Sequence, residues 1–139
     1  MKLEEKGRYA PPLRLAGRAQ KVALEIASWP GVQARSHWLL GDETVVDGAD
    51  FYLGEEELGH LHLDGTAHIP LGEALTRAVL DARLAVRFPW LAGWVMTPTE
   101  DARRTEVAKF LFRLSYDRRQ GSAIKELLAG VSGAPSLAP

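Results

Sequence analysis

The sequence predicts an α+β domain, with an antiparallel sheet of about four to five strands and helices packed mainly on one face. Three observations predict it. Apolar residues recur with helical spacing before and after a central region, that region consists of short alternating segments, and glycine-containing turns join those segments. Strands joined by short turns pair antiparallel, and helices that flank them in the chain then cover one face. A chain of 139 residues is expected to form one such domain.

The N-terminal half predicts a helix followed by strands. Residues 1–12 are polar, end in two prolines and are expected to be a flexible lead-in. Apolar residues recur with helical spacing from Leu15 to Ile26, and Trp29-Pro30-Gly31 ends this helix because proline and glycine both break helices. Residues 32–40 alternate as a half-buried strand does. Short strands are also expected at 45–46 and 50–53, with turns at 41–43, 47–48 and 54–56.

The C-terminal half predicts three helices and one more strand. An amphipathic helix runs from Leu71 to Ala82, Phe88-Pro89-Trp90 breaks it, and residues 93–97 alternate as a strand. Thr97-Pro98-Thr99-Glu100 matches a capping box, with Thr99 as a rival cap, and predicts a long helix to about Arg119. A last helix is expected from a cap at Ser122 through Leu128, ending at Gly130. The domain would then span residues 13–130, and residues 131–139 would be a disordered tail.

Composition excludes several classes of protein and site. Seventeen basic residues stand against eighteen acidic ones with no basic patch, so we expect no nucleic-acid partner. The chain has no cysteine, which excludes disulfides, thiolate nucleophiles and cysteine-based zinc sites. No apolar run is long enough to span a membrane, and the first residues lack the apolar core of a signal peptide. The sequence therefore predicts a cytoplasmic protein without a membrane partner.

Three of the four histidines lie close together, in the run from Gly59 through His60, His62 and His68 to Leu71, and the Asp64-Gly65 pair between them predicts a hairpin turn. A two-residue turn would mix histidine and aliphatic side chains on both faces. A three-residue loop, with Gly65 in a left-handed conformation, pairs His60 with His68 and Leu61 with Ala67. This register separates a polar face from an apolar one, so we prefer it. It brings His60, His62 and His68 within reach of one point.

This face has three interpretations from the residues alone. Three convergent histidines suit a zinc, iron or copper ion, so His60, His62 and His68 are candidate metal ligands. The same residues are candidate catalytic acid–base groups that act on an organic substrate without a metal. The third interpretation is a polar sheet face that binds nothing in particular. No carboxylate ligand is clear, because Glu56 shares the strand parity of His60 but lies far along the strand, and Asp64 lies in the turn.

Arg35 and His37 are candidate substrate-binding residues. They share one face of the strand at 32–40, and arginine binds oxyanions well. If that face is the histidine face, the two side chains can orient an anionic or enolic substrate. The alternative is a pair of solvated side chains.

Several motifs, taken in order, resemble the luciferase-domain family. They cover about residues 22 to 119 and are Pro30-Gly31-Val32, Glu57-Leu58-Gly59-His60-Leu61-His62, Gly65, His68-Ile69-Pro70-Leu71, Gly93-Trp94-Val95 and Leu114-Ser115-Tyr116-Asp117-Arg118. That family groups small bacterial proteins with the fungal luciferases, which add molecular oxygen to a hydroxylated pyranone and emit light. The resemblance implies that the site is the Gly-His-x-His and the following histidine, here His60, His62 and His68. This chain is much shorter than the fungal enzymes, so their substrate contacts are not carried over.

Two functions are therefore open. The first is a small-molecule enzyme that acts at the histidine face, with a divalent transition metal as its candidate cofactor. For this enzyme the resemblance implies an oxygen-dependent reaction on a small enolisable molecule. The second is a non-catalytic module whose histidine face binds a small ligand or pairs two copies of the chain as a homodimer.

Overall fold

The structure is a computed structural model that describes residues 14–39 and 41–135. The predicted lead-in at 1–12, the end of the first predicted strand at Leu40 and the last residues of the predicted tail lie outside the described residues. The described part contains four helices and six strands. They are α1 (Gly17–Ser28), β1 (Val32–Leu39), β2 (Asp42–Leu53), β3 (Glu56–His62), β4 (Ala67–Pro70), α2 (Glu73–Asp81), β5 (Val86–Arg87), β6 (Trp94–Thr97), α3 (Ala102–Arg119) and α4 (Ile124–Val131).

The predicted α+β class with an antiparallel sheet is confirmed. The six strands form one open sheet in the order β1-β2-β3-β4-β6-β5, and every neighbouring pair is antiparallel. The strand count is slightly higher than predicted. One reason is β5, whose two residues pair with Met96 and Val95 of β6 and are too few to show a period in the sequence.

The turn predicted at Asp47-Gly48 is wrong. Both residues lie inside β2, which joins the two short strands predicted at 45–46 and 50–53 into one strand of 12 residues. The turn signal marks a bulge, because the register with β1 shifts between Ser36 and Trp38. Gly48 has a φ of +136°, and a Cβ there would lie 1.9 Å from the carbonyl oxygen of Leu61. Only glycine fits this approach between β2 and β3.

A second bulge lies between β2 and β3. Phe51 pairs with Gly59 and Tyr52 pairs with Glu57, so Leu58 is an extra residue of β3. Gly59 has a φ of +143°, and a Cβ there would lie 2.6 Å from Cε1 of Phe112 and 2.7 Å from the carbonyl oxygen of His68. The bulge reverses the parity of β3, so residues before it face the opposite way from what simple alternation predicts.

Two predicted helix caps are wrong. Asp101 caps α3, with its carboxylate accepting a hydrogen bond from the backbone N–H of Arg104 at 2.9 Å. The Thr99 hydroxyl instead donates to the carbonyl oxygen of Gly65 at 2.7 Å and so ties the start of α3 to the hairpin turn. Helix α4 follows Ala123, which makes no side-chain cap, and continues through Gly130 to Val131. A propensity pattern locates a helix better than its first residue.

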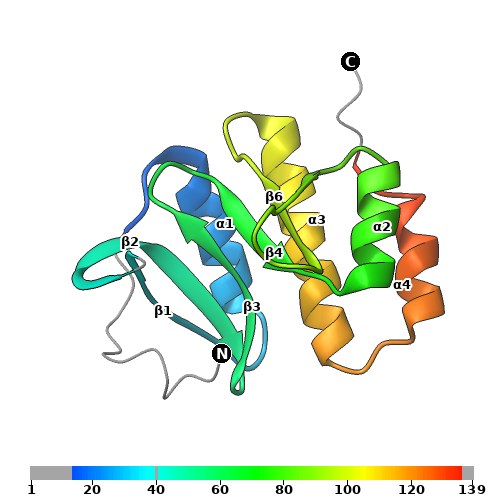
Figure 1. Ribbon diagram of the computed structural model, residues 1–139, viewed down its shortest axis with the longest axis horizontal. Coiled ribbons are helices and arrows are strands. Elements are labelled where there is room, and N and C mark those ends of the chain that lie inside the picture. The colour runs from blue at the N-terminus through cyan, green and yellow to red at the C-terminus, as the bar shows by residue number, and fades with distance from the viewer. Residues whose placement is uncertain (1–13, 40, 136–139) are drawn as a thin grey trace.

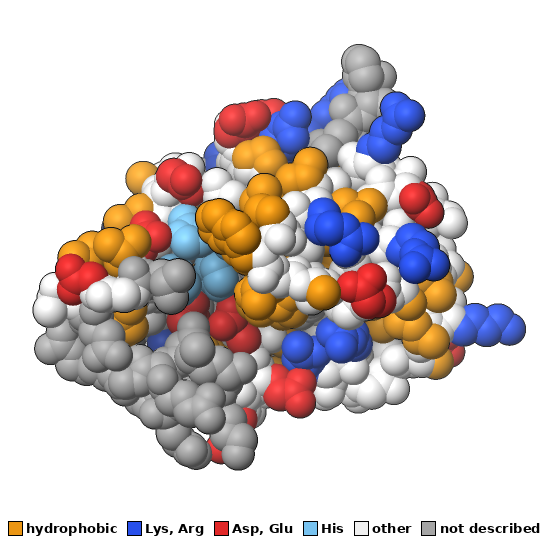
Figure 2. Space-filling view, in the orientation of Figure 1, with side chains coloured by type: hydrophobic (Ala, Val, Ile, Leu, Met, Phe, Trp, Pro, Cys, Tyr) orange, Lys and Arg blue, Asp and Glu red, His pale blue; other side chains and the backbone are white. Residues whose placement is uncertain are grey.

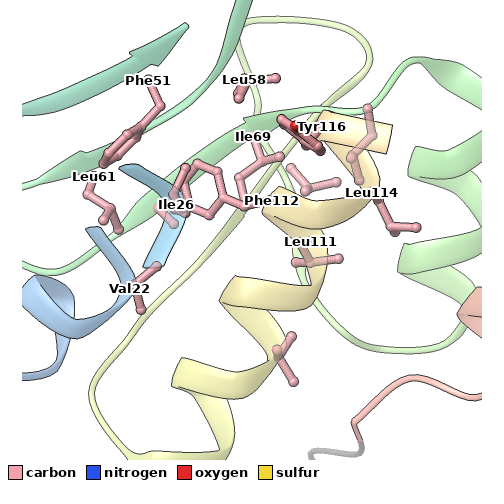
Figure 3. Close-up of a cluster of buried hydrophobic side chains, with 14 of the residues drawn as sticks. Val22, Ile26, Phe51, Leu58, Leu61, Ile69, Leu111, Phe112, Leu114 and Tyr116 are labelled. Atoms are coloured by element: carbon pink, nitrogen blue, oxygen red, sulfur yellow. The ribbon is translucent and has the colours of Figure 1, made fainter. Parts of the chain in front are cut away.

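The helices α1 and α3 cover one face of the sheet, whereas α2 and α4 pack beside each other toward the other end of the molecule (Figure 1). The core lies between this sheet face and the two covering helices (Figure 3). It includes Phe51, whose ring contacts that of Phe112 edge-on at 5.8 Å between centroids. The prediction of helices mainly on one face is therefore confirmed. Among the described residues, no helix combines the length and apolar character needed to cross a membrane.

Candidate functional site

The hairpin that carries three of the histidines has the predicted register. His60 pairs with His68 and Leu61 pairs with Ala67. The backbone N–H of His62 donates to the carbonyl oxygen of Thr66 at 2.9 Å, and the backbone N–H of Gly65 donates to the carbonyl oxygen of His62 at 3.0 Å. Gly65 has a φ of +90°, as the three-residue loop requires. Leu61 and Ala67 are fully buried in the core, so the histidines point away from it.

The four histidines of the chain meet on this second face, and we refer to His37, His60, His62 and His68 as the histidine cluster. Nδ1 of His68 lies 3.2 Å from Nε2 of His60 and 3.3 Å from Nε2 of His62. His37 comes from β1, and its ring stacks on that of His60 at 4.1 Å and 11°. It also contacts the ring of His62 edge-on at 4.9 Å. The structure therefore places His37, predicted to be beside the site, inside the cluster.

Three carboxylates hold the rings of three of these histidines. Nδ1 of His37 lies 2.7 Å from Asp50, Nδ1 of His60 lies 2.7 Å from Glu57, and Nδ1 of His62 lies 2.8 Å from Asp47. The hydroxyl of Tyr52 donates to the other oxygen of Glu57 at 3.5 Å. The pairs Asp50–His37 and Glu57–His60 are largely shielded from solvent, and Asp50 is only 1% exposed. Each pair is a charge-assisted contact that fixes a ring orientation.

Sequence reasoning missed all three carboxylates because the two bulges change strand parity. Glu57 lies three residues before His60, a spacing that points to opposite faces in a regular strand. The extra residue Leu58 brings the two side chains to one face. Asp47 and Asp50 are likewise three residues apart, with the bulge at Gly48 between them. The signal available in the sequence was a glycine inside each alternating run, which marks a bulge or a close backbone approach.

The carboxylates determine which ring nitrogen is free. A carboxylate accepts, so Nδ1 of His37, His60 and His62 carries a proton, and in the neutral form of each ring Nε2 is the nitrogen that can accept a hydrogen bond or bind a metal. The Nδ1–H of His68 is then shared between Nε2 of His60 and Nε2 of His62. The hydrogen bonds therefore fix which ring nitrogen of each histidine faces its carboxylate.

Burial and mutual repulsion lower the pKa values of two rings of the cluster, His60 and His68. Burial is the main reason that the pKa of His60 lies below its ordinary value; Glu57 opposes this shift and His37 adds to it. Burial also lowers the pKa of His68 to about 4, with repulsion from His60, His62 and His37 adding to the effect. At neutral pH both imidazoles are neutral, which is the form that binds a metal ion.

The donor set fits a transition metal. One ligand atom from each of His37, His60 and His62 lies within 4.8 Å of the others, and Asp50, Glu57 and His60 form a second such group. The distances from His68 to His60 and His62, 3.2 and 3.3 Å, also fit the predicted set of His60, His62 and His68. Two nitrogens on a tetrahedral zinc ion with bonds of about 2.05 Å are roughly 3.3 Å apart. Either a proton or a metal ion can join these nitrogens.

The surroundings of the cluster are partly apolar. The ring of Phe88 lies 4.6 Å from that of His68, and the ring of Trp94 lies 5.8 Å from that of His60. Trp90 contacts Phe88 at 5.5 Å and is 82% exposed. Figure 2 shows the histidine side chains at the surface, between hydrophobic and acidic side chains. A small molecule at the cluster would therefore meet both kinds of side chain.

Arg35 lies on the same sheet face as the cluster. In the register of β1 with β2, Arg35 lies opposite Asp50, so the side chains of Arg35 and Asp50 point to the same side of the sheet. The carboxylate of Asp50 contacts His37 of the cluster. The guanidinium of Arg35 donates to the carbonyl oxygen of Ala34 at 3.4 Å. The structure thus brings Arg35 to the predicted face, and its role in substrate binding stays a prediction.

Residues 55–115 match the model of a family described as the luciferase domain. This match confirms the resemblance to that family over this part of the chain. The matched segment contains His60, His62, His68 and Glu57, whereas His37 and the two aspartates precede it. No curated protein and no solved structure matches the chain.

Proposed function

We propose that this luciferase-domain protein is a small-molecule enzyme whose histidine cluster binds a divalent transition-metal ion. The observation that carries the proposal is the pairing of Nδ1 of His37, His60 and His62 with one carboxylate each. Histidines that bind metals usually donate their other ring N–H to a carboxylate or a carbonyl group, which fixes the tautomer and the ring orientation. Three such pairs around one point are what a preorganised metal centre needs.

The chemistry of the donors narrows the choice of metal. Imidazole nitrogens suit zinc, copper, nickel and iron, whereas calcium and magnesium prefer oxygen ligands. His37, His60 and His62 would hold the ion through Nε2, and His68 lies where it can supply a further nitrogen or move a proton. The bound ion would act as a Lewis acid that polarises a substrate oxygen.

The reaction class that the family resemblance implies is an oxygen-dependent reaction of a small enolisable molecule. Arg35, on the same face, would bind the oxyanion of the enolate, since its guanidinium presents several donors at once. Phe88 and Trp94 would contact the apolar part of the substrate. His68, neutral at pH 7, would accept the substrate proton at a ring nitrogen.

Metal analysis tests the proposal. Protein produced without a histidine tag would be loaded with zinc, copper or iron, freed of excess ion and analysed for metal by mass spectrometry. We expect stoichiometric metal in the wild type and its loss in His60→Ala and His62→Ala. Asp81→Asn, an exposed carboxylate change on α2, is the control and should bind like the wild type. Sub-stoichiometric metal in the wild type under every loading condition would contradict the metal site.

The enzymatic part has its own test. Oxygen consumption would be measured with hydroxypyranones and other small enolisable molecules, with wild type and His60→Ala side by side. Consumption that requires His60 supports the enzyme. If such molecules bind at the cluster but none of them is turned over, the result would instead favour a binding module.

A non-catalytic module is the second candidate, and the exposed apolar side chains near the cluster favour it. Val86, Trp90 and Leu91 are all exposed, and Trp90 contacts Phe88, which in turn contacts His68. A second copy of the chain docked here would cover these side chains. In that case the wild type sediments as a dimer and Trp90→Ser as a monomer, while Leu24→Ser, a change of another exposed apolar side chain on α1, leaves the dimer intact.

A further inference from the structure

Glu57, whose carboxylate orients His60, is itself held at its backbone by a residue far away in the sequence. Arg119, the last residue of α3, donates through its guanidinium to the backbone carbonyl oxygen of Glu57 at 3.3 Å. The side chain of Glu57 contacts Nδ1 of His60 at 2.7 Å, and Nε2 of His60 lies 3.2 Å from His68. A continuous set of contacts thus connects the end of α3 to the cluster.

Arg119 is well placed to hold this point of the sheet. Its side chain is only 15% exposed, and it forms an ion pair with the exposed Glu56 at 2.7 Å. Burial is the main reason that the pKa of Arg119 lies below its usual value, and Arg118 adds to this shift, while Glu56 and Glu57 oppose it. The guanidinium therefore attracts both carboxylates. Glu57 begins the bulge of β3, where the regular ladder to β2 is interrupted and an outside donor can fix the backbone.

We propose that Arg119 is a positioning residue of the metal centre, which holds Glu57 where its carboxylate accepts the Nδ1–H of His60. The inference rests on the proposed function for its effect on metal binding, but its effect on His60 does not depend on a metal. Without Arg119, the backbone carbonyl of Glu57 loses this donor, and the carboxylate of Glu57 can shift away from Nδ1 of His60. His60 can then carry its proton on Nε2, the nitrogen that the cluster needs as a ligand.

The neighbouring Arg118 provides a matched control. It has the same charge on the same helix, but its guanidinium lies beside Gly72, where a Cβ would approach it to 3.1 Å. Loss of Arg118 therefore changes the net charge as loss of Arg119 does, without touching Glu57. Glu56→Gln is a second control, because it removes the ion pair with Arg119 and leaves the contact to Glu57.

The experiment compares Arg119→Met, Arg118→Met and Glu56→Gln with the wild type. The tautomer of His60 is read from nitrogen chemical shifts of the imidazole in metal-free protein, and zinc affinity is measured by competition with a chromophoric chelator. For Arg119→Met we expect a shift of His60 toward the Nε2–H tautomer and zinc binding about 10–100-fold weaker. Both controls should match the wild type. A melting temperature measured alongside separates this effect from a general loss of stability.

A double variant adds a sharper test. Glu57→Gln should weaken zinc binding to a similar degree, and Arg119→Met added to it should cause no further loss, because Arg119 acts through Glu57. Additive losses would overturn the inference, as would a wild-type tautomer in Arg119→Met or an equal loss in Arg118→Met. If Arg119→Met does not fold, Arg119→Gln, which is neutral and shorter, is measured in the same way, and an unchanged His60 tautomer there overturns the inference.

The two proposals fail in different ways. If the wild type binds no metal under any loading condition, the metal centre is disproved. The His60 tautomer in metal-free protein then decides by itself whether Arg119 positions Glu57.

Discussion

The two faces of the β3–β4 hairpin are held by different forces. On one face Leu61, Ala67 and Ile69 are fully buried in the core. On the other face His60 and His68 take part in contacts of 2.7 to 3.3 Å, one with the carboxylate of Glu57 and the others between imidazoles. Burial of apolar area has no direction, whereas such contacts depend steeply on distance and angle. Alternation along the strands is therefore enough to form the core, but the site also needs the bulges that set where each polar side chain lies.

The bulge glycines should give the largest effect, because they support both faces. Gly48→Ala places a Cβ 1.9 Å from a backbone oxygen, so β2 or β3 must move. We expect a loss of at least about 3 kcal/mol in the free energy of unfolding, measured by urea denaturation. Gly54→Ala is the control, since its φ is +64° and nothing lies within 4 Å of its Cβ. It should cost only about 1–2 kcal/mol, and equal losses in the two variants would contradict the role of the close approach.

The apolar face can be tested by Leu61→Ala. The side chain is fully buried, so its truncation removes buried area and leaves a cavity, at a cost of about 2–5 kcal/mol. Leu63→Ala is the matched control, because Leu63 is 50% exposed and lies two residues further along. Its change should stay within about 0.5 kcal/mol. Similar losses for both leucines, measured by urea denaturation, would mean that burial does not distinguish the two positions.

The polar face can be tested by Asp50→Asn, which keeps the shape of the side chain and removes its charge. Asp50 is buried against His37 and lies 3.8 Å from Nδ1 of His60. We expect zinc affinity to fall about 10–100-fold in chelator competition. Asp117→Asn, which breaks a surface ion pair with Arg113 on α3, should leave the affinity unchanged. An unaltered affinity in Asp50→Asn would contradict a supporting role for this carboxylate.

The polar face also predicts a dependence of stability on pH in metal-free protein. The pKa of His68 falls from 6.5 to about 4 on folding, so below pH 6.5 the unfolded chain binds a proton that the folded protein does not. This difference in proton binding costs no stability above pH 6.5, and it destabilises the folded protein increasingly as the pH falls toward about 4. When the pH falls from 6.5 to about 4, the free energy of unfolding should therefore decrease less for His68→Gln than for the wild type, as measured by urea denaturation at each pH. Parallel pH profiles for the two proteins would show that His68 is not the group responsible.

The helix caps and the carboxylates show the same limit of local reasoning. Thr99 has a good capping sequence, yet its hydroxyl binds the hairpin turn and Asp101 takes the capping position. In a regular strand Glu57 and His60 would lie on opposite faces, but the extra residue Leu58 in the bulge brings both side chains to the same face. In each case a contact with a residue on another element decides between options that the local sequence leaves open. The sequence contains the options but not the choice.

The sequence by itself determined the α+β class, the apolar face of the hairpin and the pairing of His60 with His68. These features follow from the period of hydrophobic residues and from turn chemistry, both of which act over a few residues. Only the tertiary structure decided that His37 and the carboxylates of Asp47, Asp50 and Glu57 join the cluster, and that Arg119 reaches Glu57. Those residues come from three strands and a helix. Their meeting depends on the sheet order and on two bulges at glycines, where the close approach of neighbouring backbone, and not any local period, selects the residue.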